Sequence, residues 1–87
     1  MTSSSNYVLT VACPTTRGIV AAISGFLAAQ GCNITDSAQF DDRETGRFFM
    51  RVTFTSEEGV AAEALRDQFA SVAKPFAMDW EIGAAGD

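Results

Sequence analysis

The sequence has no histidine among its 87 residues and only two cysteines, Cys13 and Cys32, which do not form a Cys-x-x-Cys pair. Without histidine the usual zinc and haem sites cannot be built. The commonest general base in enzymes is missing for the same reason. We therefore predict that these residues bind no metal or other cofactor and do not catalyse a reaction by themselves.

Positive charge is also scarce, since the sequence has six Lys and Arg residues and eleven Asp and Glu residues, which gives a net charge of −5. Nucleic acid and anionic membranes attract clustered positive charge, so both are disfavoured partners. The apolar runs are far shorter than the roughly 20 residues that span a bilayer. Residues 1–6 lack the basic start and apolar middle of a signal peptide, and we expect a disordered tail there and a cytoplasmic protein.

Hydrophobic periodicity predicts six elements in the order βαββαβ. A hairpin loop over residues 41–46 joins the two middle strands. Thr15 or Thr16 is expected to cap the first helix and Ser56 the second, with Glu57 and Glu58 in the first turn of that helix. The predicted strands cover residues 7–12, 33–40, 47–55 and 76–82, and the predicted helices cover about residues 19–30 and 57–73.

Two right-handed crossovers in one sheet produce a ferredoxin-like α+β sandwich, in which two helices cover one face of a four-stranded antiparallel sheet. In the third strand the alternation places Phe49 on the uncovered face, between Arg47 and Arg51. A large apolar side chain there indicates a partner surface. In the second strand Ile34, Ala38 and Phe40 are predicted to share a face, with a bulge at Asp36 where the alternation fails.

The predicted topology separates the two cysteines. Cys13 ends the first strand and Cys32 opens the second, so a helix about 18 Å long lies between them. A disulfide needs Cα atoms within about 7 Å, which excludes a bond within one chain. We expect two reduced, partly buried thiols, because no neighbouring residue is placed to lower their pKa.

Two other functions of this fold class fit less well. Residues 46–54 loosely resemble the RNP1 pattern of RNA-binding domains, but Tyr7 is the only aromatic residue that the first strand offers for a second stacking position. The loop that contains Arg17 could hold a phosphate, as in acylphosphatases, but Pro14 removes a backbone donor from it. The acidic composition further disfavours RNA binding.

Several motifs resemble one family. They are the hairpin and strand of residues 42–51, Cys13-Pro14 followed by Gly18-Ile19-Val20-Ala21, the turn Gly31-Cys32-Asn33-Ile34, and Met78-Asp79-Trp80. Together they resemble the N-terminal ACT domain of the formyltetrahydrofolate deformylase family over residues 7–82. The run Thr-Gly-Arg-Phe-Phe-Met-Arg is the most specific part of this resemblance.

The resemblance implies a regulatory domain of an enzyme that hydrolyses 10-formyltetrahydrofolate to formate and tetrahydrofolate, in one-carbon metabolism and purine biosynthesis. The catalytic half of that family is formyltransferase-like, uses Asn, His and Asp, and is absent from these residues. Residues 83–87 have the composition of a linker toward it. A free-standing ACT protein that binds a small molecule is the alternative.

The resemblance also implies an effector site, formed by the loop after the first strand and the opening of the second strand, usually at a two-fold interface. Glycine and methionine are the expected effectors, and a homodimer is the expected assembly. The family commonly has an acidic residue after Cys-Pro, where this chain has Thr15. The predicted effector-binding residues are Pro14, Thr15, Thr16, Arg17, Gly18, Ile19, Asn33 and Ile34.

A separate interface is predicted on the uncovered face of the sheet. Arg47, Phe49 and Arg51 are expected to dock onto acidic groups, either of the catalytic half or of a second subunit.

Overall fold

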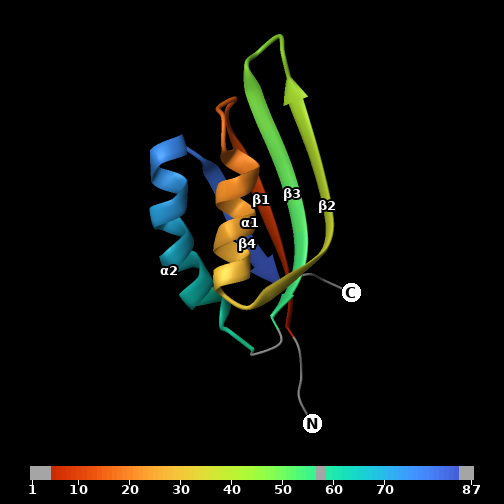
Figure 1. Ribbon diagram of the computed structural model, residues 1–87, viewed down its shortest axis with the longest axis vertical. Coiled ribbons are helices and arrows are strands. Elements are labelled where there is room, and N and C mark those ends of the chain that lie inside the picture. Colours follow the sequence, from red (N-terminus) through yellow and green to blue (C-terminus); the bar gives the residue numbers. More distant parts are fainter. Residues whose placement is uncertain (1–4, 57–58, 85–87) are drawn as a thin grey trace.

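The computed structural model describes residues 5–56 and 59–84. Within them the chain forms a four-stranded antiparallel sheet in the order β2-β3-β1-β4, with both helices on one face (Figure 1). This confirms the ferredoxin-like α+β sandwich. No helix in these two ranges is both long and apolar enough to cross a membrane. The elements are β1 (Ser5–Pro14), α1 (Ile19–Ala29), β2 (Cys32–Asp42), β3 (Arg47–Ser56), α2 (Ala62–Ala73), the 3-10 helix η1 (Lys74–Phe76) and β4 (Asp79–Ala84).

The first and last strands, β1 and β4, extend closer to the chain termini than their sequence patterns indicated. Asn6 pairs with Thr55, so β1 begins inside the predicted tail of residues 1–6. At the other end of the chain, Gly83 and Ala84 belong to β4 and pair with Val8 and Tyr7 of β1, although linker composition was expected from residue 83. Residues 1–4 and 85–87 lie outside the described residues.

Neither helix begins with the side-chain cap that the sequence suggested. The residue that caps α1 is Gly18, in a left-handed conformation with φ 91°, and not Thr15 or Thr16. The α2 helix begins at Ala62, with Ala61 in the cap position, whereas Ser56 is the last residue of β3. The hydroxyl of Ser56 is fully buried and accepts the N–H of Val60 at 3.0 Å, so it holds the connection to α2 in place of a cap. Glu57 and Glu58 lie outside the described residues.

The expected bulge in β2 is present, between Ile34 and Asp36. It shifts the alternation of side chains by one residue. Ile34 therefore lies opposite Phe54, on the face that the helices cover, whereas Ala38 and Phe40 lie opposite Arg51 and Phe49 on the uncovered face. The prediction that these three β2 residues share one face was wrong for this reason.

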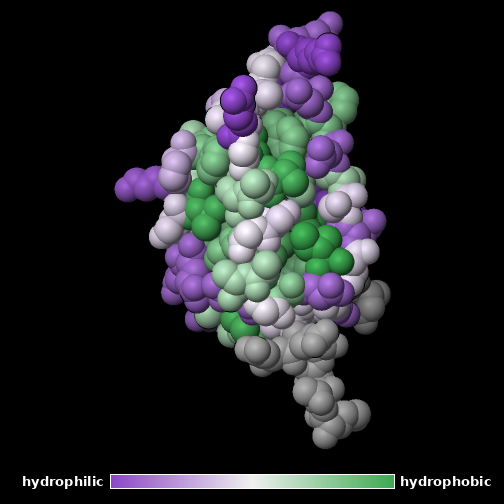
Figure 2. Space-filling view, in the orientation of Figure 1, coloured by the Kyte–Doolittle hydropathy of each residue, from purple (hydrophilic) through white to green (hydrophobic). Residues whose placement is uncertain are grey.

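The core lies between the sheet and the two helices. Phe69 of α2 is fully buried and meets Phe26 of α1 and Trp80 of β4 edge-on, with ring centroids 5.2 and 4.8 Å apart. The Tyr7 hydroxyl donates to the carbonyl of Val60 at 2.7 Å, so its ring also faces the helices. On the outer side of the helix layer α1 has no charged residue, and polar side chains gather at the tip of the β2–β3 hairpin (Figure 2).

Candidate effector site and the open sheet face

The loop between β1 and α1, residues 15–18, is held against the β2–β3 hairpin. The N–H of Thr15 donates to the carbonyl of Gly46 at 2.9 Å. The Thr15 hydroxyl donates to Oδ1 of Asp41 at 2.7 Å. These two bonds fix the start of the loop, while Thr16, Arg17 and Gly18 remain exposed. Both segments lie at the same end of the sheet (Figure 1).

Asp41 contacts this loop, which the sequence analysis did not predict. The family resemblance implies an acidic residue directly after Cys-Pro, where this chain has Thr15. The fold brings a carboxylate to that position from β2 instead, in hydrogen-bond contact with the Thr15 side chain. Only the register between β2 and the loop reveals this contact, because 26 residues separate the two positions along the chain.

The same loop leads into the N-terminus of α1. The N–H of Ala22 donates to the carbonyl of Gly18, which is the first hydrogen bond of the helix. The N–H groups of the first turn have no acceptor within the helix, and the helix dipole favours a negative charge there. The loop therefore combines backbone donors suited to a carboxylate with a side-chain carboxylate suited to an ammonium group.

Asn33 and Ile34 lie at the other end of the sheet. Asn33 pairs with Thr55, whereas Pro14 pairs with Arg47, and these two β3 residues are eight positions apart. Eight positions in a strand span about 26 Å. Within a single chain the eight predicted effector-binding residues therefore divide into two separate groups, Pro14 to Ile19 and Asn33 with Ile34. Asn33 could reach the loop only from a second copy.

The two cysteines also lie at opposite ends of β3, since Cys13 pairs with Phe48 and Cys32 with Ser56, and no disulfide joins them. Burial raises the pKa of the Cys13 thiol, and the nearby Arg47 guanidinium offsets this only in part. The thiolate is the reactive form, so we expect native Cys13 to be inert at pH 8.

The burial of Cys13 predicts slow modification of its thiol in the native state. In a Cys32→Ser variant, we expect a chromogenic disulfide reagent to react with Cys13 at least about tenfold more slowly in the folded protein than in the urea-unfolded protein. Equal rates in the two conditions would contradict the buried, protonated thiol.

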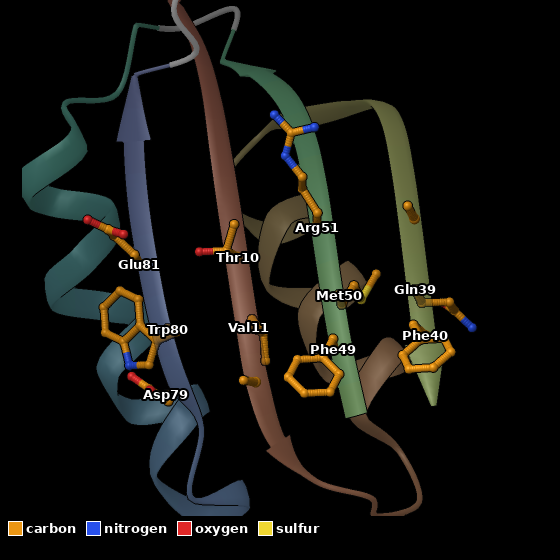
Figure 3. A pocket seen from close by; sticks show the side chains of 12 residues that line it. Thr10, Val11, Gln39, Phe40, Phe49, Met50, Arg51, Asp79, Trp80 and Glu81 are labelled. Carbon is orange, nitrogen blue, oxygen red and sulfur yellow. The ribbon is translucent and has the colours of Figure 1, made fainter. Parts of the chain in front are cut away.

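The uncovered face of the sheet is the second candidate surface. Three consecutive residues of each of the four strands line a broad hollow of about 770 Å³ there (Figure 3). Phe49 lies on this face between Arg47 and Arg51, as predicted. Phe40, which the sequence did not assign to this surface, stacks beside Phe49 with ring centroids 6.4 Å apart. Their exposed fractions, 63% for Phe40 and 40% for Phe49, mark an apolar patch in contact with solvent.

The open face does not complete an RNA-stacking platform. Tyr7, the only aromatic candidate that the sequence analysis found in the first strand, is buried on the helix-covered face. The described β1 side chains on the open face, from residue 6 onward, are Asn6, Val8, Thr10, Ala12 and Pro14, and none is aromatic. The RNP1-like resemblance of β3 therefore has no counterpart on its neighbouring strand.

Comparison with known proteins identifies one family. The ACT domain profile matches residues 7–70. The chain is 39% identical over 87 residues to a formyltetrahydrofolate deformylase of Corynebacterium sp. (strain P-1). The aligned region covers 99% of this chain and 30% of that protein. The chain thus spans less than a third of the length of that curated relative.

Solved structures agree with this match. The formyltetrahydrofolate deformylase of Pseudomonas syringae pv. tomato superposes with a TM-score of 0.88 and 34% identity, over 94% of this chain and 28% of that one. An ACT domain protein from Streptococcus pneumoniae superposes with a TM-score of 0.84 and 28% identity, over 95% of this chain and 92% of that one.

Proposed function

Because the chain belongs to the ACT domain family, we propose that it is the regulatory, amino-acid-sensing and oligomerising domain of a formyltetrahydrofolate deformylase. Identity of 39% to a deformylase supports this parent. In the proposal the catalytic half, beyond these residues, is formyltransferase-like and hydrolyses 10-formyltetrahydrofolate in the cytoplasm. Its formate and tetrahydrofolate serve one-carbon metabolism and purine synthesis, and the present domain adjusts that activity.

The observation that carries the sensing proposal is the contact between Thr15 and Asp41 at the start of the loop. A free amino acid presents a carboxylate and an ammonium group a few ångströms apart. The backbone N–H groups at the start of α1 would hold the carboxylate. The carboxylate of Asp41 would accept from the ammonium group, for which an acidic residue after Cys-Pro would be a natural partner. Glycine and methionine are the candidate effectors.

The test is calorimetric titration of the chain with glycine, methionine and serine. At least one is expected to bind. Asp41→Asn keeps the shape of the side chain and removes its charge, so it is expected to weaken that binding about 10- to 100-fold, the equivalent of one charge-assisted hydrogen bond. Asp36→Asn is the matched control, because Asp36 is an exposed carboxylate on the same strand but beside the bulge, and it should leave the affinity unchanged.

Two outcomes would contradict the proposal in different ways. If none of the three amino acids gives heat of binding, the domain does not sense these effectors. If the Asp41→Asn variant and the unsubstituted chain bind the amino acid with equal affinity, the effector does not bind at this loop. Asn33→Ala then tests the other predicted group, since it lowers affinity only if a second copy supplies Asn33 to the loop.

A free-standing ACT protein is the second candidate. The observation in its favour is the Streptococcus pneumoniae ACT domain protein, of which this chain covers nearly the whole length. The reading frame beyond Asp87 distinguishes the two, because the deformylase proposal requires a following formyltransferase-like sequence.

A further inference from the structure

We propose that the order of the edge strand β2 depends on the effector loop, residues 15–18, because Thr15 ties that loop to the β2–β3 hairpin. The tie consists of two hydrogen bonds, from the Thr15 N–H to the Gly46 carbonyl and from the Thr15 hydroxyl to the Asp41 carboxylate. We call this pair the Thr15 contact. The coupling rests on the proposed function and deepens it, because it is the route by which occupation of the loop reaches the rest of the domain.

Strand β2 is the least buried strand of the sheet. Nine of its eleven residues are exposed, and only Cys32 and Asp42 are half-buried. Among the described residues the buried core comes from β1, β3, β4 and the two helices. β2 also lies at one edge of the sheet, so its backbone pairs with β3 on one side alone. Because local opening costs least where few apolar side chains are buried, β2 is the strand expected to open before the rest of the sheet.

The Thr15 contact closes the open end of the segment that contains β2. From the effector loop the chain follows α1 back along the sheet, turns at Gly31 and returns to the hairpin through β2 (Figure 1). Two side chains, Phe40 and Thr35, hold β2 to β3 through a ring contact and a hydrogen bond to the β3 backbone. The Thr15 contact holds the same strand to the effector loop, so opening of β2 breaks it and carries Asp41 away from the loop.

A bound amino acid would add a second tie between the same elements. In the proposed function its carboxylate lies at the start of α1 and its ammonium group meets Asp41, so one ligand bridges the helix and β2. Asp41 can serve both partners, because an ionised carboxylate has two oxygens and the Thr15 hydroxyl bonds to Oδ1. A ligand that binds the closed form alone stabilises it by mass action. Binding at the loop therefore orders β2 along its whole length, about 35 Å, as far as Asn33 at the opposite end of the sheet.

Hydrogen exchange of the 87-residue chain, resolved for single amides by NMR, measures this coupling. Amides of β1 exchange by global unfolding, which breaks every contact, and they serve as the internal reference. Without an effector, the β2 amides that bond to β3 should exchange at least about tenfold faster than the β1 amides.

Replacing Thr15 with valine removes the hydroxyl donor and keeps the shape of the side chain. The Thr15→Val variant should speed exchange about three- to tenfold, the equivalent of one hydrogen bond, and by the same factor in β2 as in β1. Thr16→Val is the matched control, because the Thr16 hydroxyl bonds to the Pro14 carbonyl and this bond stays intact when β2 opens. The control should therefore leave exchange in β2 unchanged.

The second measurement adds whichever of glycine, methionine and serine binds in the calorimetric titration. At a free concentration about 100 times its Kd, the β1 amides should slow about 100-fold, because the amino acid binds only the folded chain. The β2 amides should slow by the same factor to within about threefold, because their opening dismantles the site. If the site stayed intact when β2 opens, their exchange would not change.

Three results without the effector would overturn the coupling. They are β2 amides as well protected as those of β1, unchanged β2 exchange in Thr15→Val, and an equal acceleration of β2 by Thr16→Val. With a bound amino acid, slowing in β1 but not in β2 would overturn it and leave the proposed function intact. If no amino acid binds, the proposed function fails, whereas the pair of threonine variants still decides whether the Thr15 contact holds β2.

Discussion

Replacing Phe69 with alanine is expected to lower the free energy of unfolding by about 3–5 kcal/mol, the range for a fully buried phenylalanine. The Phe69 side chain is completely enclosed and joins three elements, because its ring meets Phe26 of α1 and Trp80 of β4 at centroid distances of 5.2 and 4.8 Å. Truncation would leave a cavity between the helix layer and the edge of the sheet. A domain of this length has a total stability of only about 4–13 kcal/mol, so much of it would be lost.

Urea denaturation measures this effect, followed both by circular dichroism and by the fluorescence of Trp80, the only tryptophan of the chain. Phe40→Ala is the matched control because it removes the same ring from a side chain that is 63% exposed. The control should cost less than about 1 kcal/mol, because the Phe40 ring is mostly in contact with solvent. Similar losses for the two variants would mean that Phe69 does not occupy the core position described above.

Substituting alanine for Gly18 and for Gly25 is expected to change stability in opposite directions. Gly18 has φ 91°, a conformation that costs an L-residue about 1–2 kcal/mol, and it is the residue from which α1 starts. Gly25 lies inside the same helix, where alanine is favoured over glycine by roughly 0.5–1 kcal/mol. A Cβ atom at either position meets nothing within 4 Å, so backbone conformation alone decides the sign.

The two glycine variants serve as controls for each other, because the chemical change and the helix are the same. Their midpoints of thermal unfolding should lie on opposite sides of the unsubstituted protein, with free energies of unfolding that differ by roughly 1.5–3 kcal/mol. A Gly18→Ala variant as stable as Gly25→Ala would show that the chain enters α1 without a left-handed residue.

Local patterns in the sequence were sufficient for the order of the elements and for the buried face of β3. Phe48, Met50, Val52 and Phe54 alternate strictly with polar or partner-facing residues, and the structure buries all four. The antiparallel sheet with both helices on one face followed from the handedness of crossovers, a property of any chain of L-residues. The two helix starts failed because threonine and serine side chains that can cap a helix can equally bond to a strand or a loop, as Thr15 and Ser56 do here.

The candidate sites depended on contacts between residues far apart in the chain. One inserted residue in β2 moved Ile34 to the helix-covered face and left Phe40 beside Phe49, a change that alternation alone cannot locate. Strand register also brought Asp41 to Thr15 and separated Asn33 from the loop by the length of β3. The sequence by itself determined the ferredoxin-like layers and the uncharged first helix, because periodicity and composition are local properties. Only the tertiary structure decided which carboxylate meets the loop and how charge lies across the open face, because pairing between strands is set by the folded chain as a whole.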